Sequence, residues 1–233
     1  MSDDTTGSTT ANNRDNPLWL ACWRDRNIDF HQSAVNPLLV RFWPTLNLPA
    51  QASIFIPLCG KSLDLLWLAA QGHSVIGSEL SPIAVRAFFR ENRLEPTRRP
   101  VGALTLWEHG NIRILCGDFF RLTAADLGDI AAVYDRAALT ALPEDVRPAY
   151  LAHLAKIVPA DCLTLLLTTE EPEDGETEDQ PFAVADEISS LYAATFAIEL
   201  IHVESLFEAD PAGDGHGEIR VEHKVYRLDP KAG

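Results

Sequence analysis

The residues best placed to do chemistry lie in a short loop, Pro57-Leu58-Cys59-Gly60-Lys61-Ser62, which directly follows the apolar run at residues 54–56. A loop between a strand and a helix can bring backbone N–H groups close to a small ligand. This loop has a single glycine, so it lacks the Gly-x-Gly-x-x-Gly pattern of dinucleotide sites. It also lacks the Gly-x-x-x-x-Gly-Lys-Ser/Thr spacing of a phosphate-binding loop, so Gly60-Lys61-Ser62 alone does not indicate an ATP site.

Glu79 is the second candidate. It comes just after the apolar run at residues 74–77 and lies nineteen residues after Gly60. A carboxylate at the end of a neighbouring parallel strand can accept hydrogen bonds from both hydroxyls of a ribose. A lone loop glutamate is more often simply solvated, so this interpretation depends on the strand–turn–helix–strand context. Together, Gly60 and Glu79 predict a nucleoside site.

Two further strand ends point to the same crevice. Asp118 and Phe119 follow the apolar run at residues 111–115, where an adenine would lie, while Asp135 and Arg136 close a later strand, near the reactive end of the ligand. Each has a structural alternative, because Asp118 can cap the next turn and Asp135 with Arg136 can form a structural ion pair. Together they favour a site for a nucleoside joined to an amino acid.

The elements that position these residues alternate along the chain. Apolar periodicity and capping residues predict helices at residues 17–26, 36–44, 62–71, 81–91, 143–158 and 186–195, and strands or strand pairs at residues 54–56, 74–77, 104–109, 111–115, 131–134, 163–167, 196–203 and 224–228. Strands that alternate with helices imply a parallel sheet covered on both faces. The last two strands are joined only by a loop, which predicts one antiparallel edge.

Domain organisation follows from the same pattern. Residues 1–16 are polar and rich in small residues, which predicts a disordered tail, and residues 17–230 are expected to form a single domain. The acidic segment at residues 170–179 is expected to be a surface loop. The N-terminus lacks the basic and apolar regions of a signal peptide, so we expect a cytoplasmic protein.

Composition narrows the choice of partners. The chain has a formal net charge of −15, which argues against nucleic acid because phosphate binding needs clustered Lys and Arg. Its apolar runs are too short to cross a membrane. The four cysteines lack Cys-x-x-Cys spacing, so we expect reduced thiols and no metal site. The expected partner is therefore a small molecule, and the expected state is a monomer.

Longer motifs resemble one known family. Ile56-Pro-Leu-Cys-Gly-Lys-Ser-Leu-Asp-Leu-Leu-Trp-Leu-Ala, followed by Gly-His-x-Val-x-Gly-x-Glu-Leu-Ser at residues 72–81, is similar to bacterial thiopurine S-methyltransferases. Further matches run in order from about residue 17 to residue 228, and they are Trp19-x3-Trp23-x6-Phe30-His31, Cys116-Gly-Asp-Phe-Phe, Tyr134-Asp-Arg-Ala-Ala-Leu and Lys224-Val-Tyr-Arg-Leu. The resemblance implies a class I methyltransferase that uses S-adenosylmethionine and releases S-adenosylhomocysteine.

The implied fold is α/β, a doubly wound, mostly parallel, seven-stranded Rossmann-like methyltransferase sheet with an antiparallel edge strand and an N-terminal helical addition. The implied roles of the site residues group by the part of the ligand that they contact. Trp19 and Trp23 cover the cofactor, Leu58 and Gly60 contact its methionine part, Glu79 binds the ribose, Asp118 and Phe119 flank the adenine, Arg136 lies between cofactor and acceptor as the catalytic residue, and Phe30, His31 and Phe182 line the acceptor pocket.

The acceptor side departs from the family pattern. The family carries an aromatic–acidic segment followed by Pro-Pro-Phe after the fifth strand, where this chain has Thr168-Thr169-Glu170-Glu171, an acidic insertion and Gln180-Pro181-Phe182. We therefore expect methyl transfer to a sulfur acceptor (a thiol, a thiopurine or a hydrogen sulfide-like molecule) or to a related selenium or tellurium compound, with the individual acceptor left open.

Three alternatives remain at this point. A halide or thiocyanate methyltransferase would use the same donor with a different acceptor. A nicotinamide-dependent dehydrogenase would use a similar sheet, although the absence of the second and third loop glycines argues against it. A non-catalytic nucleoside-binding module would keep the fold alone, although Glu79, Arg136 and the paired tryptophans argue against a degenerate site.

Overall fold

The computed structural model describes residues 15–136, 138–170, 184–209 and 218–231. These residues form one sheet of nine strands in the order β3-β4-β5-β2-β1-β6-β7-β9-β8. The parallel strands in its middle are β5 (Ile112–Cys116), β2 (Ser74–Glu79), β1 (Ser53–Ile56), β6 (Ala132–Arg136) and β7 (Leu163–Glu170). The chain winds outward from β1 in both directions, so the predicted doubly wound α/β fold is confirmed.

Antiparallel strands extend the sheet at both edges, which corrects the prediction of seven strands and one antiparallel edge. On one side β3 (Thr97–Val101) and β4 (Leu104–His109) precede β5, and on the other β9 (Glu218–Pro230) and β8 (Phe196–Ala209) follow β7. Strand β3 was not predicted because it reads Thr-Arg-Arg-Pro-Val and is mostly exposed, without apolar alternation. An edge strand tolerates its proline because no further strand needs that N–H group.

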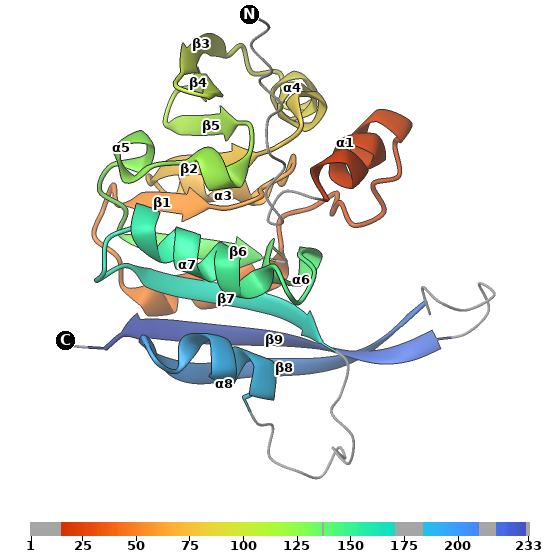
Figure 1. Ribbon diagram of the computed structural model, residues 1–233, viewed down its shortest axis with the longest axis vertical. Coiled ribbons are helices and arrows are strands. Elements are labelled where there is room, and N and C mark those ends of the chain that lie inside the picture. Colours follow the sequence, from red (N-terminus) through yellow and green to blue (C-terminus); the bar gives the residue numbers. More distant parts are fainter. Residues whose placement is uncertain (1–14, 137, 171–183, 210–217, 232–233) are drawn as a thin grey trace, which may run out of the picture.

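The last two strands are longer than expected. Pairing of β8 with β9 continues from Phe196↔Pro230 to Ala209↔Glu218, past the end of β7, as the two-stranded ribbon that leaves the sheet in Figure 1. The expected loop at residues 208–217 therefore begins later than predicted. The acidic segment at residues 171–179 and Phe182 lie outside the described residues.

Both faces of the sheet are covered by helices. Ile54 and Ile56 belong to the core that includes residues of α2 (Pro37–Phe42), η2 (Trp43–Leu46), α3 (Asp64–Ala70) and α4 (Pro82–Glu91). Phe55 points to the opposite core, with residues of α5 (Ala124–Leu127), α6 (Ala138–Ala141), α7 (Arg147–Ile157) and α8 (Asp186–Tyr192). This alternation along β1 is the period-two pattern of a strand buried on both faces.

Local capping explains several helix starts. Pro82 stands at the first turn of α4, and the Ser81 side chain accepts a hydrogen bond from the backbone N–H of Ile83, as its Ser-Pro sequence predicted. Helix α7 begins at Arg147, later than the predicted Pro143, because residues 143–146 form a turn in which Val146 N–H donates to the Pro143 carbonyl. Helix α6 and the short helices η3 (Phe119–Arg121) and α5 were not predicted.

The N-terminal helix α1 (Asn16–Asp25) lies beyond the C-terminal ends of the parallel strands (Figure 1). It begins one residue before the predicted Pro17, so Asp15 and Asn16 belong to the helix and its N-terminal end rather than to the predicted tail. The rest of that tail, residues 1–14, lies outside the described residues. Helix α1 is thus placed over the edge of the sheet where a doubly wound fold binds its ligands.

Candidate active site

A pocket opens at the C-terminal edge of the parallel strands, beneath α1. It brings together every predicted site residue that the structure describes, namely Trp19, Trp23, Phe30, His31, Leu58, Gly60, Glu79, Asp118, Phe119 and Arg136. The remaining prediction, Phe182, lies outside the described residues. Residues from five separate segments therefore meet at one site, as expected for a crevice at the switch point of an open α/β sheet.

The loop after β1 is held against β2 by hydrogen bonds from its backbone N–H groups. Cys59 N–H donates to the Ser78 carbonyl at 2.8 Å, and Leu58 N–H donates to Ser78 Oγ at 3.2 Å. Leu58 has a φ of +45° and Gly60 a φ of +56°, so the loop turns sharply before α3. A Cβ atom at Gly60 would lie 3.3 Å from Cζ2 of Trp23, so glycine lets the indole lie over the loop.

Glu79 lines the pocket from the end of β2. Its carboxylate accepts hydrogen bonds from Gly60 N–H at 2.9 Å and from Ser81 N–H at 2.6 Å. The side chain is buried, and this burial raises its pKa to about 7 against the opposing effect of the N–H donors. The carboxylate thus ties the loop of β1 to the end of β2 and can change charge near neutral pH.

The adenine-side candidates have structural roles as well. Asp118 caps η3 by accepting a hydrogen bond from Phe120 N–H at 3.0 Å, which is the alternative that its sequence position raised. Phe119 is buried against Tyr150, with ring centroids 4.9 Å apart. Both residues also line the pocket, so capping and ligand contact are compatible here.

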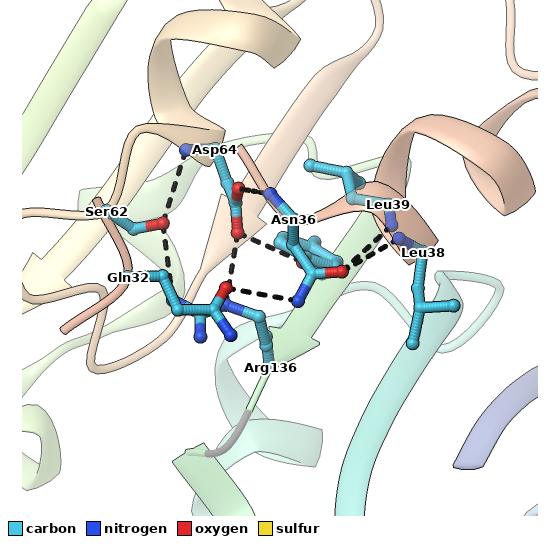
Figure 2. A network of polar contacts seen from close by, with 8 residues as sticks. Gln32, Asn36, Leu38, Leu39, Ser62, Asp64 and Arg136 are labelled. Atoms are coloured by element: carbon cyan, nitrogen blue, oxygen red, sulfur yellow. Dashed lines mark hydrogen bonds and ion pairs between the residues drawn. The ribbon is translucent and has the colours of Figure 1, made fainter. Parts of the chain in front are cut away.

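The predicted alternative of an Asp135–Arg136 ion pair is wrong. Asp135 points away from the pocket into the core, where Tyr150 Oη donates to its carboxylate at 2.6 Å and burial raises its pKa to about 6. Arg136 instead pairs with Asp64, from Nε to Oδ2 at 3.1 Å, and its Nη2 lies 3.4 Å from Ser62 Oγ (Figure 2). Consecutive residues on a strand face opposite sides, which explains why the two side chains separate.

Sequence reasoning missed Asp64 and Tyr150. Asp64 is in the first turn of α3, where an acidic residue is usually read as a favourable partner of the helix dipole. Nothing in its local sequence marks it as the partner of an arginine seventy-two positions later. Tyr150 lines the pocket from α7, a helix without a recognisable motif. Both residues reach the site through contacts with residues far away in the sequence, which only the folded structure shows.

Aromatic rings form the N-terminal wall of the pocket. Phe30 packs edge-on against Trp19 and Trp23, with ring centroids 5.6 and 5.7 Å apart. Trp23 is buried, whereas Phe30 is 49% exposed and lies at the rim. His31 is beside them, and burial together with the nearby cations Lys61 and Arg136 lowers its pKa. The imidazole is therefore neutral at physiological pH.

Other expected features concern metals, thiols and membranes. Among the described residues, no group of three or more His, Cys, Asp or Glu side chains is arranged to hold a metal ion. The four cysteines are free thiols in the structure. None of the helices that the structure describes is long and apolar enough to span a membrane.

Comparison with known proteins identifies the family. The family model of thiopurine S-methyltransferase matches residues 14–231. The thiopurine S-methyltransferase of Stutzerimonas stutzeri (strain A1501) is 56% identical over 217 residues, which cover 93% of this chain and 92% of that protein.

Solved structures of low sequence identity share the fold. A SAM-dependent methyltransferase from Anabaena variabilis has a TM-score of 0.61 at 14% identity, covering 93% of this chain and 95% of its own. The magnesium protoporphyrin IX methyltransferase of Synechocystis PCC 6803 has a TM-score of 0.57 at 16% identity, covering 95% of this chain and 100% of its own. The predicted Rossmann-like fold is confirmed by these likenesses, and the predicted family by the whole-length match. The chain belongs to the thiopurine S-methyltransferase family.

Proposed function

We propose that this enzyme transfers the methyl group of S-adenosylmethionine to the sulfur of a small thiol, or to a related selenium or tellurium acceptor, and releases S-adenosylhomocysteine. The observation that carries the proposal is the convergence of the Gly60 loop, Glu79 and Arg136 in one pocket under the indole of Trp23. Family membership makes the chain a methyltransferase that uses S-adenosylmethionine. The sulfur acceptor is the part that the pocket supports and that needs a test.

The residues present fit this cofactor. Gly60 has no Cβ atom, so the Trp23 indole can lie close to the loop. Glu79 offers a buried carboxylate at the end of β2, the position from which ribose hydroxyls are bound in doubly wound folds. Asp118 and Phe119 lie at the end of β5, on the side where the adenine would lie. We assign the methionine part to Leu58 and Gly60.

Bound S-adenosylmethionine supplies a methyl group on a sulfonium, which is already an activated electrophile. The protein's task is then to hold the acceptor sulfur in line with the methyl carbon, and such positioning can contribute about 7–11 kcal/mol. Trp23 and Phe30 exclude water from the acceptor, and Phe182 is proposed to do the same. The Arg136 guanidinium lowers the pKa of an acceptor thiol, because a nearby cation favours the thiolate.

The proposal is tested by a product screen with methyl-labelled S-adenosylmethionine. The acceptors are hydrogen sulfide, methanethiol, an aromatic thiol, selenite, tellurite, iodide and thiocyanate. We expect label in the methanethiol formed from hydrogen sulfide, in the thioether formed from a thiol, or in the methylated selenium or tellurium compound. Label in methyl iodide or methyl thiocyanate alone would replace the proposed acceptor class with the halide and thiocyanate class.

Calorimetry separates the remaining alternatives. We expect S-adenosylmethionine and S-adenosylhomocysteine to bind and NAD to show no heat of binding. Binding of NAD in preference to both ligands would favour a dehydrogenase. Binding of both ligands without any labelled product in the screen would favour a non-catalytic module. We also propose a monomeric, cytoplasmic protein with no nucleic-acid partner, which sedimentation and cell fractionation can test.

A further inference from the structure

One buried carboxylate joins three segments behind the pocket. Asp64 is 1% exposed, and each of its oxygens accepts hydrogen bonds (Figure 2). Oδ1 accepts from the backbone N–H of Asn36 at 2.8 Å. Oδ2 accepts from Tyr134 Oη at 3.0 Å and from Arg136 Nε at 3.1 Å. The Asn36 N–H and the Arg136 guanidinium can only donate, so each carboxylate oxygen faces a group that needs an acceptor, and Asp64 forms an ion pair with Arg136.

This carboxylate determines where the Arg136 guanidinium lies. Nε is bound by Asp64, and Nη2 lies 3.4 Å from Ser62 Oγ, which also accepts from Asp64 N–H at 3.2 Å. The head of Arg136 is thus fixed against the first turn of α3, while the side chain, 18% exposed, reaches the pocket. A guanidinium bound on two nitrogens has a defined orientation.

The same carboxylate also anchors the segment that carries the aromatic rim. Asn36 donates its backbone N–H to Asp64, and its side-chain amide donates to Gln32 Oε1 at 3.2 Å. Gln32 directly follows Phe30 and His31 in the chain, and both line the pocket. Asp64 therefore positions both Arg136 and the segment that carries Phe30 and His31.

The charge of Asp64 has a second consequence. S-adenosylmethionine carries a sulfonium cation, and a methyltransferase that places an arginine near the reacting sulfur brings two positive charges together. In a site shielded from water this repulsion is larger than in solution. S-adenosylhomocysteine has a neutral sulfur, so it is free of the repulsion. A buried anion bound to the arginine offsets its charge and leaves its hydrogen-bond donors in place.

We propose that Asp64 is the positioning residue of Arg136 and that its charge allows Arg136 to lie beside the cationic methyl donor. The inference rests on the proposed role of Arg136 in this site. It predicts a specific effect of charge: loss of the Asp64 charge weakens binding of the cationic donor more than binding of the neutral product. A purely structural role would weaken both ligands by the same factor.

The experiment compares dissociation constants of S-adenosylmethionine and S-adenosylhomocysteine by calorimetry for the wild type and for Asp64→Asn. We expect the ratio of the donor constant to the product constant to rise about tenfold in Asp64→Asn, which corresponds to about 1.4 kcal/mol. Asp64→Glu keeps the charge and is expected to retain the wild-type ratio. An unchanged ratio in Asp64→Asn, whether both ligands weaken equally or neither does, would overturn the proposal.

Variants of Arg136 give an independent test, because they are expected to change the ratio of the two dissociation constants in the opposite direction. Arg136→Gln leaves the Asp64 charge without its cation, so the ratio is expected to fall below that of the wild type. The double variant Asp64→Asn/Arg136→Gln has neither charge, and its ratio is expected to return toward the wild-type value. If Asp64→Asn does not fold, Arg136→Gln still tests the proposal. A ratio of the donor to the product dissociation constant that stays at the wild-type value in Arg136→Gln contradicts the proposal.

Two matched controls separate charge from packing. Tyr134→Phe removes one donor to Asp64 while both charges remain, so the ratio should stay as in the wild type. Asp229→Asn breaks an Arg–Asp pair of 2.8 Å with Arg227 on β9, outside the pocket lining, and should leave both ligands unaffected. If the wild type binds neither ligand, the proposed function fails first. If it binds both but methylates no sulfur, only the acceptor assignment fails.

Discussion

At the scale of single residues, Glu79 is a buried carboxylate whose charge can change near neutral pH. Burial raises its pKa to about 7, although two backbone N–H groups favour its ionised form. An ionised carboxylate accepts hydrogen bonds from ribose hydroxyls better than a protonated one does. Cofactor binding should therefore favour the ionised form and lower this pKa.

The Glu79 pKa predicts how the affinity for S-adenosylhomocysteine depends on pH. The affinity for S-adenosylhomocysteine should increase as pH rises toward the Glu79 pKa of about 7 and level off above it, because the unbound protein must first lose the proton. Calorimetry from about pH 5.5 to about pH 8.5 measures this, and Glu79→Gln should flatten the curve. Tighter binding on acidification would contradict the ribose role.

Arg136 supports a separate prediction about turnover. Arg136→Ala should lower kcat about a hundredfold while affinity for S-adenosylhomocysteine changes only a few-fold, because in the proposed function the guanidinium acts on the acceptor sulfur and not on the cofactor. Steady-state kinetics with an alkyl thiol and with a more acidic aromatic thiol measure the effect. The loss should be smaller for the aromatic thiol, which is already ionised. Equal losses of turnover and affinity, or none, would refute this role.

The site residues show what local sequence can and cannot predict. Gly60, Glu79, Asp118 and Arg136 could be placed together because each follows an apolar strand, and the ends of parallel strands meet at one edge. Asp64 could not be linked to Arg136, because the two residues are seventy-two positions apart and meet only in the folded protein. The alternative of an ion pair between Asp135 and Arg136 was wrong because neighbours along a strand face opposite sides.

At the scale of elements, α1 and the loop after β1 depend on each other. Gly60 is needed for two reasons, its φ of +56° and the 3.3 Å that would separate its Cβ from Trp23. The elements with regular periodicity, such as β1, β2 and α4, were predictable. Strand β3 was not, because an edge strand is not required to have alternating apolar residues. The distal parts of β8 and β9 were not predicted either, because they pair only with each other beyond the end of β7.

Gly60→Ala tests this dependence. The variant should lose about 1–2 kcal/mol of stability from its backbone conformation and should also bind S-adenosylhomocysteine at least about tenfold more weakly, because Trp23 is displaced. Gly102→Ala is the matched control, since Gly102 has the same φ of +56° and nothing within 4 Å of its added Cβ. It should lose stability alone. Equal ligand affinity in the two variants would show that Trp23 does not depend on this glycine.

At the scale of the whole molecule, the antiparallel edge opposite β3 contains a buried ion-pair cluster. Lys224 is 1% exposed and lies 3.1 Å from a Glu170 oxygen and 3.2 Å from a Glu222 oxygen. Glu222 is itself buried and pairs with Arg220 at 2.9 Å. The cluster joins β7 to β9, so the sheet extension depends on charges that compensate one another.

Lys224→Met should therefore be strongly destabilising. Removing the Lys224 ammonium leaves the Glu170 carboxylate and the buried Glu222 carboxylate without this compensating positive charge. The free energy of unfolding is expected to fall by about 3–5 kcal/mol. Urea denaturation measures the loss. Lys156→Met is the control, because Lys156 is exposed on α7 and should change stability by no more than about 0.5 kcal/mol. Similar stability of the two variants would mean that the buried cation contributes little.

The most direct test of the central claim is a crystal structure of the enzyme with S-adenosylhomocysteine. We expect the ribose hydroxyls at the Glu79 carboxylate, the homocysteine part at the Leu58–Gly60 loop beneath Trp23, and the sulfur on the side of Arg136. A ligand bound elsewhere, or one in this pocket with its sulfur turned away from Arg136, would contradict the proposed function.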